Sequence, residues 1–91
     1  KNGRLLPLSY FFPPNTDYRK TVLDEILKQA DENMAENPNI YFEDYRKLIV
    51  KTFDPRQYYL TPEGIVIYFQ QYDIAPYSTG IVEFTVPYPE L

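Results

Sequence analysis

The chain has 91 residues, a net charge of −4 and an isoelectric point of about 4.6, and it contains neither cysteine nor histidine. This length predicts a single domain, because compact domains usually run to about 100–150 residues. Without Cys and His, disulfides, the usual zinc sites and catalysis by thiolate or imidazole are excluded. The acidic surface disfavours nucleic acids, whose phosphates it repels.

No apolar run approaches the roughly 20 residues of a membrane span, so we expect no direct membrane insertion. The sequence starts at Lys1 without an initiating Met and ends at Leu91 after "PYPE". We therefore expect residues 1–91 to be one domain taken from a longer protein.

The N-terminal segment is interrupted by Pro7, Pro13 and Pro14. Prolines at this density forbid a long helix and remove backbone donors. We therefore expect Leu5–Leu8 to be a lead-in or a short edge strand. Ser9–Phe12 is expected to form a packed turn that delivers its three rings to the core.

A long amphipathic helix is predicted from Asp17 to about Glu36, because apolar side chains recur there at helical spacing. Asn15 or Thr16 is expected to cap its first turn, and "NPN" at Asn37–Asn39 to end it. The apolar stripe comprises Val22, Leu23, Ile26, Leu27, Ala30 and Met34.

A second, short helix is predicted from about Glu43 to Lys51. Its apolar positions follow the spacing i, i+3, i+4, i+8. Asp54-Pro55 closes it, because a residue before proline is pushed out of the helical region. The apolar positions are Tyr45, Leu48, Ile49 and Phe53.

From Arg56 onward the apolar period changes to two, which is typical of strands. Arg56–Leu60 and Ile65–Gln71 are predicted to form a hairpin around "TPEG", a sequence suited to a type I turn. The second of these strands is apolar on both faces and is expected to be central. "IVEFTVPY", from Ile81, is the third strand.

The order of two helices and then three strands predicts an α+β fold, with both helices packed on one face of a small, three-stranded, mainly antiparallel sheet. The predicted core comprises Val22, Leu23, Ile26, Leu27, Leu48, Ile49, Ile65, Ile67, Phe69 and Phe84.

Paired acids occur at Asp24-Glu25, Asp31-Glu32 and Glu43-Asp44. Adjacent side chains on a helix point about 100° apart, so no pair converges on one atom and a solvated helix surface is the favoured interpretation. The chain also lacks a Gly-rich phosphate loop and a calcium loop. We expect no enzyme activity, no metal and no cofactor.

Six tyrosines cluster in the strand half of the sequence. They predict either a sugar-stacking or protein-binding surface, or rings that fill the core of a protein without Trp. The alternation of the strands favours the second interpretation. The six are Tyr58, Tyr59, Tyr68, Tyr72, Tyr77 and Tyr88.

The loop "YDIAPYSTGI" has two interpretations. Pro76 fixes one dihedral and Gly80 permits a positive φ, so the loop is shaped rather than slack. Asp73 and Ser78 are suited to hydrogen-bond nearby backbone amides, which is a structural role. The alternative is a rigid recognition loop that displays Tyr77.

The segment "YYLTPEGIVIYFQQYDIAPYSTGIVEFTVPY", from Tyr58 to Tyr88, and the opening "NGRLLPLSYFF" resemble a family of extracytoplasmic bacterial domains of unknown function. This family includes the C-terminal domain of the lysozyme-sensing anti-sigma factor RsiV, and it resembles the non-catalytic segment of the peptidoglycan deacetylase PdaC. The chain departs from the family's opening pattern at Tyr10, within a turn. The resemblance implies a location outside the cytoplasm, secreted or membrane-anchored, and transfers no binding residues.

Two hypotheses follow from charge and resemblance together. In the first, the chain is a non-catalytic binding or sensing module that receives a cationic protein such as lysozyme. Tyr72 and Tyr77 are then the candidate aromatic anchors, with Asp73 and Glu63 as nearby charges. In the second, it is an accessory domain of a peptidoglycan-modifying enzyme, which binds wall glycan or positions a catalytic domain.

Overall fold

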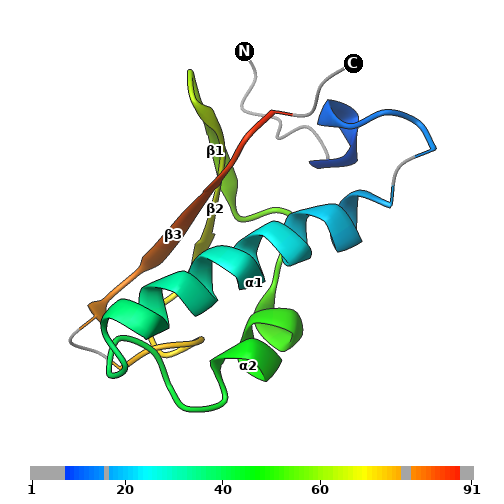
Figure 1. Cartoon of the computed structure of the whole chain (residues 1–91). Coiled ribbons are helices and arrows are strands. Elements are labelled where there is room, and N and C mark those ends of the chain that lie inside the picture. The colour runs from blue at the N-terminus through cyan, green and yellow to red at the C-terminus, as the bar shows by residue number, and fades with distance from the viewer. Residues whose placement is uncertain (1–7, 16, 77–78, 89–91) are drawn as a thin grey trace.

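The structure is a computed structural model of the chain, and it describes residues 8–15, 17–76 and 79–88 (Figure 1). Its two α-helices and three-stranded antiparallel sheet confirm the predicted α+β class. The elements in chain order are the 3₁₀ helix η1 (Leu8–Phe11), α1 (Tyr18–Glu36), α2 (Tyr45–Thr52), β1 (Tyr58–Thr61), β2 (Gly64–Phe69) and β3 (Val82–Val86).

The strands lie in the order β1-β2-β3, and both pairs are antiparallel, so β2 is central as predicted. Ile67 lies opposite Tyr58 on one side and opposite Phe84 on the other. Because opposed residues share a face, these three side chains point the same way. This inner face packs against the helices, which lie on one side of the sheet in Figure 1.

The hairpin of β1 and β2 is confirmed, but its bounds differ from the predicted Arg56–Leu60 and Ile65–Gln71. β1 starts later because Arg56 is held in a turn, where its backbone N–H donates to the Asp54 carboxylate at 2.9 Å. β2 ends earlier because Gln70 enters the next turn. Both turns are closed by aspartate side chains, which compete well with strand hydrogen bonds.

The start of α1 corrects the predicted cap. Asp17 is the N-cap, and its carboxylate accepts the backbone N–H of Lys20 at 3.2 Å. Asn15 therefore does not cap this helix, and Thr16 lies outside the described residues. The end of α1 follows the prediction: Asn37 is the C-cap, and its N–H donates to the carbonyl of Asn33 at 2.9 Å.

α2 begins two residues later than the predicted Glu43. Residues 43 and 44 form a turn, which is closed by the N–H of Tyr45 donating to the carbonyl of Phe42 at 3.0 Å. The helix ends at Thr52, immediately before the C-cap Phe53.

The N-terminal segment corrects two expectations. Leu8 is buried and starts a 3₁₀ helix rather than ending a strand, while residues 5–7 lie outside the described part. Of the three rings expected in the core, that of Phe12 is buried and that of Phe11 half-buried. The ring of Tyr10 is 68% exposed.

The predicted core is confirmed at all but two positions. Leu27 and Leu48 are only half-buried and pack against the edge of the core. Loops contribute further buried residues that the predicted core did not include: Phe12, Tyr41, Phe53, Ile74 and Ala75.

Two glycines are required for different reasons. Gly80 has φ +74°, the positive value expected from the sequence. Gly64 pairs with Thr61 at the hairpin end, where a Cβ atom would lie 2.4 Å from the carbonyl oxygen of Val86. Gly64 therefore permits close approach of the backbones.

Candidate functional site

The loop between β2 and β3, described at residues 70–76 and 79–81, is fixed to the link between the two helices at Ile74 and Thr79. The N–H of Phe42 donates to the carbonyl of Ile74 at 2.9 Å, and the hydroxyl of Thr79 donates to the carbonyl of Ile40 at 2.9 Å. Ile74 and Ala75 are almost fully buried. We call the end of the molecule formed by this loop and residues 37–44 the tip; it lies at the lower left of Figure 1.

Tyr72 is displayed by a tight turn at the tip. Its φ is +71°, an uncommon value for a bulky residue, and its side chain is 62% exposed. The Asp73 carboxylate accepts the N–H of Gln70 at 3.1 Å, and the N–H of Asp73 donates to the carbonyl of Gln70 at 3.1 Å. These bonds hold the turn and confirm the predicted structural role of Asp73. A strained backbone that displays a large ring is typical of a functional surface.

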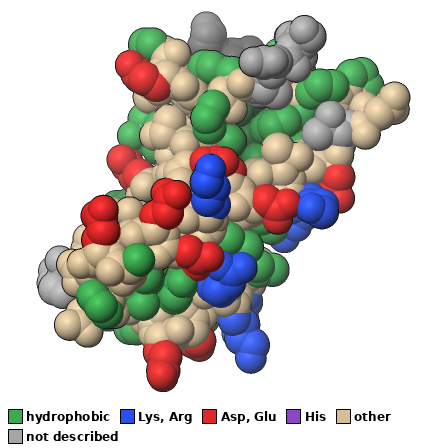
Figure 2. Space-filling view, in the orientation of Figure 1, with side chains coloured by type: hydrophobic (Ala, Val, Ile, Leu, Met, Phe, Trp, Pro, Cys, Tyr) green, Lys and Arg blue, Asp and Glu red, His purple; other side chains and the backbone are tan. Residues whose placement is uncertain are grey.

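The tip carries acidic charge without basic charge. Residues 29–45 and 57–91 contain no Lys or Arg, and the charged residues of the tip are Glu43, Asp44 and Asp73, all acidic. On the face shown in Figure 2, the Lys and Arg side chains gather over α1 and α2. The same loop carries a second exposed large apolar side chain, that of Ile81, which is 54% exposed.

The four predicted partner-binding residues are only partly brought together. Tyr72 and Asp73 are adjacent at the tip, and Tyr77 lies outside the described residues. Glu63 lies in the turn before β2, at the opposite end of that strand. Six strand residues at about 3.3 Å each separate it from the tip, so Glu63 does not belong to the same surface. Ile81 was not among the predicted binding residues, although its alternation with the buried Val82 indicated an outward position.

The sequence favoured the interpretation that the tyrosines of the strand half fill the core. The structure does not agree for most of those that it describes. Tyr58 is buried, but Tyr59, Tyr72 and Tyr88 are 44%, 62% and 40% exposed. Tyr68 is half-buried. The core obtains its aromatic volume from phenylalanines instead, such as Phe69 and Phe84, whose ring centroids lie 6.0 Å apart.

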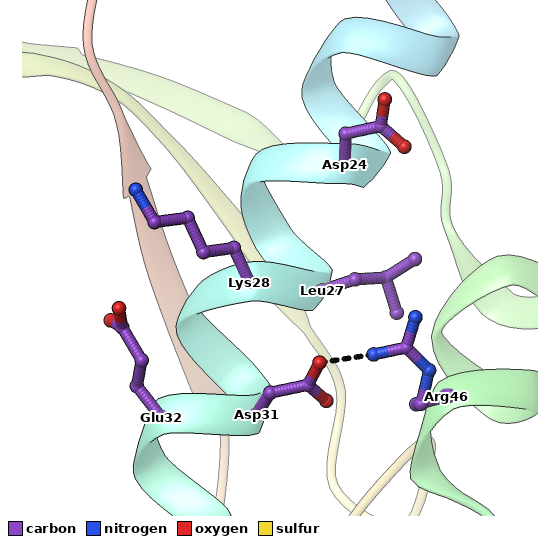
Figure 3. A pocket seen from close by; sticks show the side chains of 6 residues that line it. All are labelled: Asp24, Leu27, Lys28, Asp31, Glu32 and Arg46. Atoms are coloured by element: carbon purple, nitrogen blue, oxygen red, sulfur yellow. Dashed lines mark hydrogen bonds and ion pairs between the residues drawn. The ribbon is translucent and has the colours of Figure 1, made fainter.

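A second feature is an open hollow between α1 and α2, of about 450 Å³ (Figure 3). Asp31 accepts hydrogen bonds from the Tyr45 hydroxyl and from the Arg46 guanidinium across the two helices. These bonds, with that of Tyr45 the larger cause, lower the pKa of the Asp31 carboxyl. The hollow is lined by Asp24, Leu27, Lys28, Asp31, Glu32 and Arg46.

The hollow is better explained as a helix–helix contact than as a reaction site. Asp31 and Arg46 are about half exposed and neutralise each other. Asp24 and Glu32 are exposed, as the predicted solvated helix surface requires. Asp31 differs, because its carboxylate also joins α1 to α2.

We expect Asp31→Asn to destabilise the fold slightly at pH 7 and not in acid. A carboxyl whose pKa is lowered by folding stabilises the protein above its unfolded pKa, near 3.9, and this stabilisation is lost as the pH falls through the folded pKa. The loss at pH 7 should be small, as is usual for exposed ion pairs. Urea unfolding of both proteins from pH 7 to pH 2 measures the difference. A difference that persists at pH 2 would contradict this assignment.

The described residues contain no group of three or more His, Cys, Asp or Glu side chains able to hold a metal ion. They also contain no buried polar or charged side chain. In the same part of the chain, no helix is long and apolar enough to cross a membrane.

The fold and the tip together define a small α+β domain that presents an acidic tip, built on hydrogen-bonded loops, at one end of a three-stranded sheet. The chain belongs to the family described as "Protein of unknown function (DUF3298)", whose model matches residues 9–89. It is 38% identical over 93 residues to "Anti-sigma-V factor RsiV" of Bacillus subtilis (strain 168), a match that covers 96% of this chain. These matches confirm the resemblance to the family and to RsiV. The match covers 32% of that relative, so the chain spans about a third of the length of the curated relative it matches.

Proposed function

We propose that the chain is a non-catalytic extracytoplasmic sensing module, one domain of a longer bacterial envelope protein, that receives a cationic protein such as lysozyme. The observation that carries the proposal is the tip: an exposed Tyr72 on a fixed turn, among charges that are all acidic. The match to an anti-sigma factor supports a signalling context.

The tip combines the two features that such recognition requires. An acidic surface speeds the approach of a basic partner, and an exposed aromatic side chain supplies apolar area that a complex can bury. Because the loop is already held by Phe42–Ile74 and Thr79–Ile40 hydrogen bonds, little ordering entropy is lost on binding.

The non-catalytic part of the proposal is supported by the state of the described carboxylates. Asp31 and Asp54 are engaged by arginines, and Asp73 by a backbone amide. None of these carboxylates is buried, so the described part of the chain presents no desolvated acid of the kind that general acid catalysis uses.

The test is calorimetric titration of the domain with hen lysozyme at low and at physiological salt. We expect saturable binding that persists at about 0.15 M salt, where the Debye length is near 8 Å. Tyr72→Ala should weaken it by roughly tenfold or more, the loss typical of an interface anchor. Tyr10→Ala is the matched control, because Tyr10 is equally exposed and lies on η1, away from the tip.

Binding seen only at low salt would reveal bare charge attraction and would overturn the sensor proposal in favour of the accessory-domain role. An equal loss in Tyr10→Ala and Tyr72→Ala would contradict the assignment of the tip.

A further inference from the structure

The face of the sheet opposite the helices forms a second surface, distinct from the tip. Residues that alternate with the core positions point toward it, as the register of both strand pairs shows. Figure 1 shows α1 and α2 on the other side of the sheet. We call this surface the open face. It comprises Tyr59, Val66, Tyr68, Glu83 and Thr85 on the strands, with Gln57 and Gln70 beside them, whose side-chain amides are hydrogen-bonded to each other.

Two tyrosines on neighbouring strands of the open face form its aromatic part. Tyr59 on β1 lies opposite Val66 on β2, so Tyr68 is its diagonal neighbour, at about 7–8 Å between Cα atoms. Tyr59 is 44% exposed and Tyr68 half-buried, while Val66 between them is covered. The rings of Tyr59 and Tyr68 therefore belong to one continuous surface.

The remainder of the open face is polar and nearly uncharged. The Tyr59 hydroxyl donates to Glu83 Oε2 at 3.0 Å, and the amide of Gln70 lies 3.5 Å from that of Gln57. Gln70, Glu83 and Thr85 are exposed. The single carboxylate and the absence of Lys and Arg disfavour a polyanion such as nucleic acid or a phosphate polymer.

We propose that the open face binds a linear chain of β-linked N-acetylhexosamines. Aromatic rings offer flat apolar area to the C–H faces of pyranose rings, and the two tyrosines suit this contact. The glutamine amides and Thr85 can pair with sugar hydroxyls, and the Glu83 carboxylate can accept an acetamide N–H. An uncharged, hydroxyl-rich polymer fits a surface of this composition.

The inference uses the proposed function only for location: outside the membrane, such glycan strands surround the domain. It does not depend on the lysozyme partner, because its two rings, Tyr59 and Tyr68, lie on β1 and β2, and Gln70 alone lies at the boundary with the tip. Failure of one proposal therefore leaves the other standing.

The test is titration of the ¹⁵N-labelled domain with chitohexaose, followed by amide chemical shifts. We expect saturable shifts concentrated on β1, β2 and β3. Tyr68→Ala should weaken binding roughly fivefold to tenfold, because one stacking ring is lost. Tyr59→Phe keeps the ring and loses only the hydroxyl bond to Glu83, so it should retain most of the affinity.

Tyr72→Ala is the matched control, since it removes an exposed ring at the tip and should leave chitohexaose binding unchanged. Absence of saturable shifts would overturn the proposal. So would an equal loss in Tyr68→Ala and Tyr72→Ala. Equal affinity for cellohexaose, which lacks acetamide groups, would overturn the role of Glu83 in recognising an N-acetyl group.

Discussion

Replacing Ile67 by Ala is expected to lower the free energy of unfolding by about 2–5 kcal/mol, as for other large-to-small core substitutions. Ile67 is fully buried at the centre of β2, between Tyr58 and Phe84 on the neighbouring strands. Neither neighbour can move into the space, because both are held in register by the ladders. The substitution therefore loses apolar burial and leaves a cavity.

Urea unfolding at 25 °C measures this loss, and Ile81→Ala is the matched control. The side chain of Ile81 is 54% exposed, so its removal should change stability by no more than about 0.5 kcal/mol. A loss below about 1 kcal/mol for Ile67→Ala would mean that the inner face of the sheet has been misassigned.

Gly64→Ala is expected to destabilise the domain by about 1–3 kcal/mol or more, the usual cost of forcing atoms into filled space. The new Cβ would lie 2.4 Å from the carbonyl oxygen of Val86 and 3.2 Å from Cα of Pro87. Both atoms belong to the backbone, so no side chain can rotate away. β2 and β3 would have to separate at this end of the sheet.

Gly80→Ala distinguishes a clash from backbone strain. A Cβ at Gly80 meets no atom within 4 Å, but φ is +74°, and an L-residue pays roughly 1–2 kcal/mol in this region. Gly80→Asn should recover part of this cost, because Asn tolerates positive φ. Thermal unfolding of Gly64→Ala, Gly80→Ala and Gly80→Asn measures these effects. If Gly64→Asn were more stable than Gly64→Ala, the clash at Gly64 would be contradicted.

The elements that sequence predicted best are those whose stability comes from a repeating apolar pattern. α1 and β3 are recognisable because burial follows their own period, as at Ile26 and Phe84. The element ends were less predictable because single side chains decide them. Asp17 rather than Asn15 caps α1, and Asp54 and Asp73 close the turns that shorten β1 and β2.

The candidate site was predictable only where local sequence determines the geometry. Pro76 and Gly80 indicated a shaped loop, and Asp73 a local hydrogen bond. The separation of Glu63 from Tyr72 was also predictable, because the two residues flank the predicted strand. The burial of Ile74 and its hydrogen bond to the helix link depend instead on tertiary packing. Such tertiary relations leave no mark in the spacing of residues.

The hydrogen bond from Phe42 to Ile74 makes the domain suited to a readout by hydrogen exchange. This amide belongs to the link between the helices, yet its protection depends on the loop that carries Tyr72. Exchange at Phe42 therefore reports local opening of the tip, which needs less free energy than global unfolding. A partner that clamps the loop should slow this exchange without touching Phe42, whereas a ligand on the far side of the sheet should leave it at its resting rate.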